Sequence, residues 1–160
     1  MSTRREARER VMQALYAHEQ SGGDASYVAH MVLLSAFEDD PKTQDFAENL
    51  FRTTLEVQAD ADEVIQRHAT NWALDRITAI DRALLRMATA ELLAFEEIPP
   101  KVSIDEAIEI AKVYSTPDSG PFVNGVLDAV LMDLHEQGRL HKSGRGLIGM
   151  EAIRERADSQ

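Results

Sequence analysis

Apolar residues recur at spacings of three and four along nearly the whole chain, whereas strict alternation over five or more residues is hard to find. The first spacing is the period of an amphipathic helix and the second is that of a strand. The pattern therefore predicts an all-α protein, a compact helical bundle of about seven helices. We expect the helix over residues 78–95 to be central, because its apolar stripe is nearly continuous.

Capping residues and helix breakers set the expected boundaries. Thr3 can cap a first helix that ends before Gly22, and proline after residue 40 ends a second helix over about 25–37. Further helices are expected to begin near Lys42, at Asp60, at Thr78, at Ser103 and at Pro121. We expect one domain over residues 1–142 and a flexible or weakly helical tail over 143–160.

Two residues inside the last predicted helix lower its intrinsic stability. Asn124 and Gly125 are both poorer helix formers than alanine. The favoured interpretation is close helix–helix packing at Gly125 and a hydrogen bond from the Asn124 amide to backbone. A functional contact is the alternative.

Composition excludes several classes of protein. The 160 residues suit one compact domain, and 44% hydrophobic with 28% charged residues is typical of a folded globular chain. There is no cysteine, so disulfides, thiolate metal sites and cysteine nucleophiles are excluded. No apolar run is long enough for a membrane span or a signal peptide, and we expect a cytoplasmic protein.

The net charge of −11 argues against indiscriminate nucleic-acid binding, but the charge is unevenly distributed. Residues 24–63 hold ten acidic residues against two basic ones, whereas the first ten residues hold four arginines against two glutamates. Arg4 and Arg8 are four apart and share a helix face, beside a polar strip of Arg5, Gln13 and Tyr16. This is either an RNA-facing ridge or a solvated face with Arg–Glu pairs, and charge alone leaves both open.

No motif for catalysis was found. The chain lacks the Gly-x-Ser-x-Gly and Gly-x-x-x-x-Gly-Lys spacings, and its five histidines are scattered. Because these motifs are missing, we expect a protein that is not an enzyme and has no metal or cofactor.

Asp118 and Ser119 precede a helix N-terminus, which is a position that favours anions.

Three blocks in order resemble the signature of the NusB family: IDRALLRMA at 80–88, IPPKVSIDEAIEIAK at 98–112 and FVNGVLD at 122–128. The opening residues 4–16 are similar to the start of that family as well. The resemblance implies two three-helix sub-bundles and a role in transcription antitermination. The implied partners are boxA-type single-stranded RNA in nascent ribosomal RNA and NusE, a small-subunit ribosomal protein. Other Nus factors and RNA polymerase would be engaged indirectly.

The resemblance also implies the site residues. The RNA surface would consist of Arg4, Arg5, Arg8, Gln13, Tyr16, Arg86, Lys112, Asp118, Ser119 and Phe122. The protein partner would contact Asp81, Arg82, Pro100, Lys101 and Val102. Self-association through the partner face stays open.

Two alternatives belong to other classes. A related helical domain targets RNA in some ribosomal RNA cytosine methyltransferases, although this chain has no glycine-rich cofactor loop on a strand. The other alternative is a protein-only interaction bundle, in which the arginine ridge would have no RNA to bind.

Overall fold

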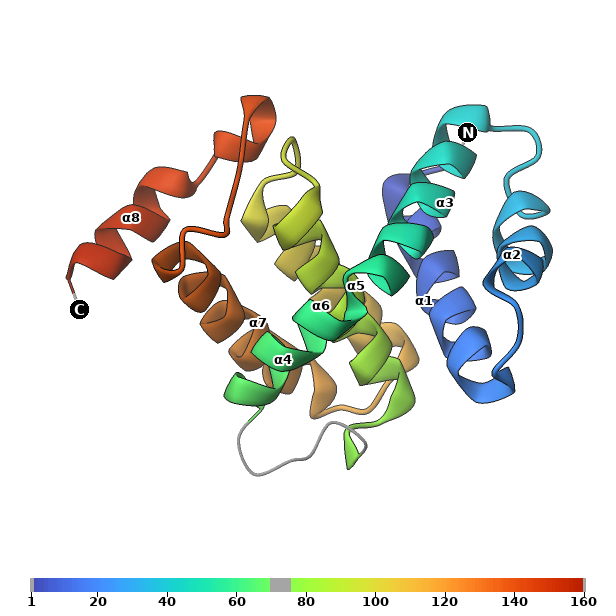
Figure 1. The fold of residues 1–160 in the computed structure, drawn as a ribbon, viewed down its shortest axis with the longest axis horizontal. Helices are drawn as coiled ribbons and strands as arrows, with labels where there is room; N and C mark the ends of the chain where they lie inside the picture. The colour runs from blue at the N-terminus through green and yellow to red at the C-terminus, as the bar shows by residue number, and fades with distance from the viewer. Residues whose placement is uncertain (1, 70–75, 160) are drawn as a thin grey trace. The chain divides into compact units, whose positions relative to one another are not determined.

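The computed structural model describes residues 2–69 and 76–159, and every regular element within those ranges is helical (Figure 1). The predicted all-α fold is therefore confirmed. The elements are α1 (Arg4–Ser21), α2 (Ala25–Val28), η1 (Ala29–Leu34), α3 (Pro41–Glu56), α4 (Gln58–His68), α5 (Ala79–Ala94), α6 (Pro100–Tyr114), α7 (Ser119–Glu136), η3 (Gly144–Leu147) and α8 (Met150–Asp158). Within the described residues no helix is long and apolar enough to cross a membrane.

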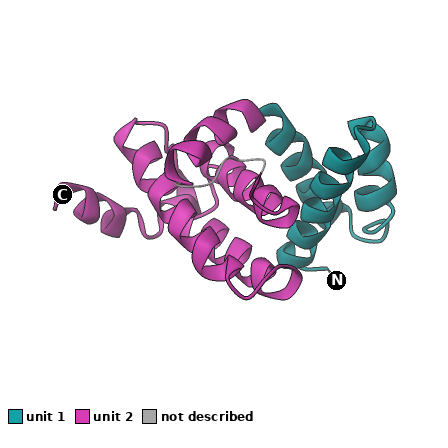
Figure 2. Cartoon of the chain, turned by 90° about the horizontal axis from the view of Figure 1, so that it is seen from below, with its two compact units in different colours: residues 1–57 teal, residues 58–160 magenta. Residues whose placement is uncertain are grey.

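The chain divides into two compact units, residues 1–57 and 58–160 (Figure 2). In the first unit α1 packs against α3 and η1. In the second, α5 contacts α4, α6 and α7, and ten of its residues are buried. The prediction that this helix is central is confirmed for its own unit.

Local signals explain the ends of α1. The hydroxyl of Thr3 accepts the N–H of Glu6 at 3.1 Å, as its capping position predicts. Gly22 ends the helix with φ at 63°, a conformation that glycine adopts at low cost.

The second predicted helix differs from an α-helix. After one turn of α2 the backbone widens into a π-helical turn at η1, in which the Ser35 N–H donates to His30 O. The buried residues Val28 and Leu33 are five apart, and a π turn, with more residues than an α turn, brings such a pair closer to one face.

Three predicted helix starts were wrong because the helices begin earlier. α4 begins at Gln58, so Asp60 lies in its first turn. α6 begins at Pro100, where proline suits the first helical turn, and Ser103 lies inside it. The Ser103 hydroxyl donates to the buried Glu91 carboxylate at 2.8 Å instead of capping a helix. α7 begins at Ser119, two residues before Pro121.

The packing interpretation of Gly125 was also wrong. The residue is exposed, and a Cβ built on it would meet no atom of the described chain within 4 Å. Asn124 is exposed as well. The two poor helix formers of α7 therefore face open space.

The segment after residue 142 is held against the second unit rather than forming an unattached linker. The Lys142 ammonium donates to the carbonyl oxygens of Glu91 and Phe95 at the end of α5, at 3.2 and 2.8 Å. The Ser143 N–H donates to Glu96 O at 3.0 Å. Burial lowers the pKa of Lys142 to about 8, against the opposing effect of nearby glutamates.

Side chains of α8 complete this attachment. Met150 and Ile153 are buried, and Arg156 makes a bidentate pair with Asp128 of α7, with both N···O distances at 2.8 Å. The pair with Arg156 lowers the pKa of Asp128. Apolar burial and an ion pair therefore both join α8 to the second unit.

Candidate RNA-binding site

The arginines of α1 are arranged around an aromatic ring of α3. The guanidinium carbons of Arg4 and Arg8 lie 4.3 and 5.4 Å from the centroid of the Phe46 ring. Both distances fit a cation–π contact, which confirms that the two arginines share one face. Arg4 and Arg5 are exposed, but only 2% of Arg8 is. Arg8 therefore lies beneath the exposed cationic face and adds positive charge to it from inside the protein.

Further along α1 the predicted polar strip is more open. Tyr16 is 43% exposed, so part of its ring can stack on an unpaired base. Gln13 is half-buried, and its side-chain oxygen accepts from Arg10 at 3.5 Å.

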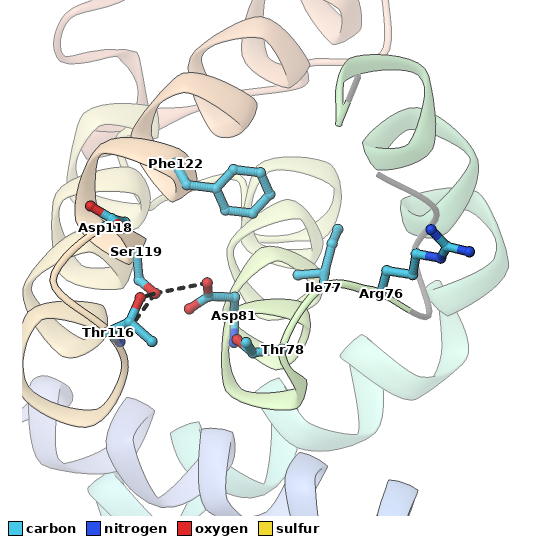
Figure 3. A pocket seen from close by; sticks show the side chains of 8 residues that line it. All are labelled: Arg76, Ile77, Thr78, Asp81, Thr116, Asp118, Ser119 and Phe122. Carbon is cyan, nitrogen blue, oxygen red and sulfur yellow. Dashed lines mark hydrogen bonds between the residues drawn. The ribbon is translucent and has the colours of Figure 1, made fainter. Parts of the chain in front are cut away.

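In the second unit, three predicted RNA-binding residues line one pocket of about 250 Å³ (Figure 3). These are Asp118, Ser119 and Phe122, all at the start of α7. The pocket also includes residues from the start of α5 and the α6–α7 loop: Arg76, Ile77, Thr78, Asp81 and Thr116.

A hydrogen-bond cluster joins two of the pocket residues, Asp81 and Ser119, to Ser115. The hydroxyls of Ser115 and Ser119 donate to the two carboxylate oxygens of Asp81, at 2.7 and 2.8 Å. Ser119 also accepts the Thr116 N–H at 3.2 Å. Asp81 is 5% exposed and Ser119 only 1%. The hydroxyl of Ser119 is therefore used inside the protein, and direct RNA contact through it stays a prediction.

Two other predicted RNA-binding residues lie outside the pocket lining. The Arg86 guanidinium makes a bidentate pair with Asp62 of α4, at 2.7 and 2.9 Å, and its side chain is mostly buried. That pairing leaves little of the guanidinium for a phosphate. Lys112 is exposed on α6 and lies 3.1 Å from Glu109.

The structure separates the residues predicted to contact a protein partner. Asp81 and Arg82 lie in the first turn of α5, where Arg82 donates to Ile77 O. Pro100, Lys101 and Val102 follow the other end of that helix. A rise of about 1.5 Å per residue puts the two ends of α5 roughly 20 Å apart. Asp81 and Pro100 are buried and Arg82 is half-buried, whereas Lys101 is exposed and Val102 is 40% exposed.

Sequence reasoning missed several residues of this site. Asp62, Arg76, Ser115 and Thr116 carried no motif, because each acquires its role from a residue distant in sequence or from the pocket geometry. The helix start predicted at Thr78 is confirmed to within one residue, since α5 begins at Ala79. The Thr78 hydroxyl caps that helix by accepting the Asp81 N–H at 3.4 Å. Among the described residues, no group of three histidines or carboxylates is placed to hold a metal ion.

Comparison with known proteins decides the family. A profile described as the NusB family matches residues 5–132, which is most of the chain. The chain belongs to the NusB family. Its members are transcription antitermination proteins and not enzymes. α8 lies beyond the matched residues.

Two relatives show how closely the chain follows the family. The transcription antitermination protein NusB of Salinibacter ruber is 65% identical over 159 residues, which cover 99% of each chain. The Geobacter sulfurreducens protein of the same name is 37% identical over 138 residues, 86% of this chain and all of its own. Both relatives match over essentially their whole length.

Solved structures of the NusB family have the same fold. T. maritima NusB has a TM-score of 0.75 at 40% identity and covers 81% of this chain and 91% of its own. A crystal structure of the antitermination factors NusB and NusE with double-stranded RNA has a TM-score of 0.74 at 25% identity. That match covers 81% of this chain and 96% of the other.

Proposed function

We propose that this chain acts in the cytoplasm as one half of an RNA clamp. It binds boxA-type single-stranded RNA in nascent ribosomal RNA transcripts, and NusE completes the binding surface. The solved complex of a family member with NusE and double-stranded RNA supports NusE and RNA as the partners, and the single-stranded form of the RNA is our proposal. The observation that carries the RNA half is the stacking of Arg4 and Arg8 on Phe46, which concentrates positive charge on a protein of net charge −11.

The exposed members of the predicted set and the half-buried Phe122 contact the RNA directly. Arg4 and Arg5 attract phosphate, and Tyr16 and Phe122 offer rings for base stacking. Lys101 and Val102 are the proposed contact for NusE.

The test is RNA binding by a variant that combines Arg4→Ala with Arg5→Ala. Arg8 is left in place because it is buried and its removal would also disturb packing. Each phosphate contact to a single strand contributes a slope of roughly −0.7 to the dependence of log K on log salt. Loss of two contacts should therefore weaken binding and reduce that slope by about 1.4.

A charge-matched control combines Arg145→Ala with Arg154→Ala, two exposed arginines near the C-terminus. Its net charge changes by the same amount. Weaker RNA binding in the α1 variant alone would therefore show that the α1 site, and not the total charge of the protein, is responsible. Titrations of a boxA-type RNA with and without NusE, at two salt concentrations, measure both. Binding of NusE without any RNA affinity would favour a protein-only interaction bundle.

A further inference from the structure

We infer that Asp81 and Ser115 are positioning residues for the RNA site. They hold the α6–α7 loop so that Asp118 and Phe122 already have their RNA-bound positions in the free protein. This inference rests on the proposed function, and it gives Asp81 a different role from the surface contact implied by the family resemblance.

The geometry joins three elements at one carboxylate. Asp81 comes from the first turn of α5, Ser115 directly follows α6, and Ser119 begins α7. One carboxylate oxygen accepts from Ser115 at 2.7 Å and the other from Ser119 at 2.8 Å. Figure 3 shows the Asp81 carboxylate directed at Ser119 below the Phe122 ring. The ends of the loop are therefore tied to the same group.

The loop backbone is bound into the same cluster. Thr116 donates its N–H to the Ser119 hydroxyl at 3.2 Å, and the Ser119 N–H donates to the Thr116 carbonyl oxygen at 3.0 Å. A carboxylate only accepts, so each of its two oxygens can take one hydroxyl donor, whereas an asparagine of the same shape has one accepting oxygen and a donating amino group. Hydrogen bonds to an ionised acceptor are also stronger than neutral ones.

The consequence for binding follows from entropy. A loop held in the bound conformation loses little freedom when RNA binds, whereas a loosened loop must be ordered at that moment. Removing the Ser115 hydroxyl should therefore raise the Kd for RNA, by roughly tenfold, although Ser115 is not among the residues that line the pocket.

The experiment compares Ser115→Ala with Ser103→Ala. Ser103 also donates to a carboxylate, Glu91, at 2.8 Å, but inside α6 and away from the loop. Both changes remove one hydroxyl–carboxylate bond and should lower the melting temperature. Only Ser115→Ala should weaken binding of a boxA-type RNA with NusE present and speed hydrogen exchange of the amides of residue 116 and residues 118–120.

Two further variants sharpen the result. Ser115→Thr keeps a hydroxyl and should restore RNA binding. Asp81→Asn keeps the shape of the side chain but replaces one acceptor by a donor, and should weaken binding as Ser115→Ala does.

Equal RNA affinity in wild type and Ser115→Ala would overturn the inference, as would equal weakening in Ser115→Ala and Ser103→Ala. Absence of RNA binding by the wild type with NusE would instead contradict the proposed function.

Discussion

Replacement of Gly146 by alanine should detach the C-terminal segment. A Cβ built on Gly146 would lie 1.8 Å from the carbonyl oxygen of Glu96, far inside any real contact. That oxygen also accepts the Ser143 N–H at 3.0 Å, so Glu96 cannot move away from Gly146 without breaking this hydrogen bond. The segment with η3 and α8 must therefore move instead.

The size of the effect is limited by the free energy that docks α8. Met150 and Ile153 are buried there, and burial of each such side chain contributes about 1.5–3 kcal/mol before ordering entropy opposes it. We expect Gly146→Ala to lower the free energy of unfolding by roughly 1–3 kcal/mol. Gly125→Ala is the matched control, because its added methyl enters open space within α7. It should raise stability by about 0.5–1 kcal/mol.

Urea denaturation followed by circular dichroism measures both free energies, and limited trypsin digestion reports on detachment. Arg154 and Arg156 lie in α8, so Gly146→Ala should be cleaved there sooner than the wild type. Shifts of the same sign in the two variants, or unchanged cleavage in Gly146→Ala, would refute the steric reasoning.

Three further predictions concern the interior. The folded pKa of Lys142 is about 8, below the ordinary 10.5, so the unfolded chain binds more protons between these values and stability should rise with pH across that window. Lys142→Met should abolish the rise, as seen by comparing urea midpoints at pH 7.5 and 10. Asp62→Ala leaves the largely buried Arg86 without its bidentate partner and should cost about 1.5–3 kcal/mol in the same assay. Phe51→Ala empties a fully buried position and should cost about 3–5 kcal/mol, measured against a milder Phe51→Leu.

The features predicted from sequence were those with local causes. The cap at Thr3, the left-handed Gly22 and the α1 face shared by Arg4 and Arg8 each depend on residues within a few positions of one another. The start of α6 was misplaced because Ser103 looks like a cap locally, whereas a carboxylate twelve residues earlier determines its role.

The pocket could not be predicted for the same reason. Its hydrogen-bond cluster joins Asp81 to Ser119 across 38 residues, and Arg86 meets Asp62 across 24. Periodicity shows which side of a helix is apolar, but it does not show which polar side chains of different helices will meet. Family resemblance brought Asp81 and Ser119 to attention separately, and only the structure placed them in contact.

The Phe46 ring makes the cationic face a property of two helices rather than of one sequence. A peptide of α1 alone would carry the same arginines, but as mobile side chains with about 2 kcal/mol of rotamer entropy each to lose on meeting phosphate. On the folded unit, the ring already limits where Arg4 and Arg8 can go. The positive charge therefore comes from α1, whereas the position of the charged groups is set by Phe46 of α3.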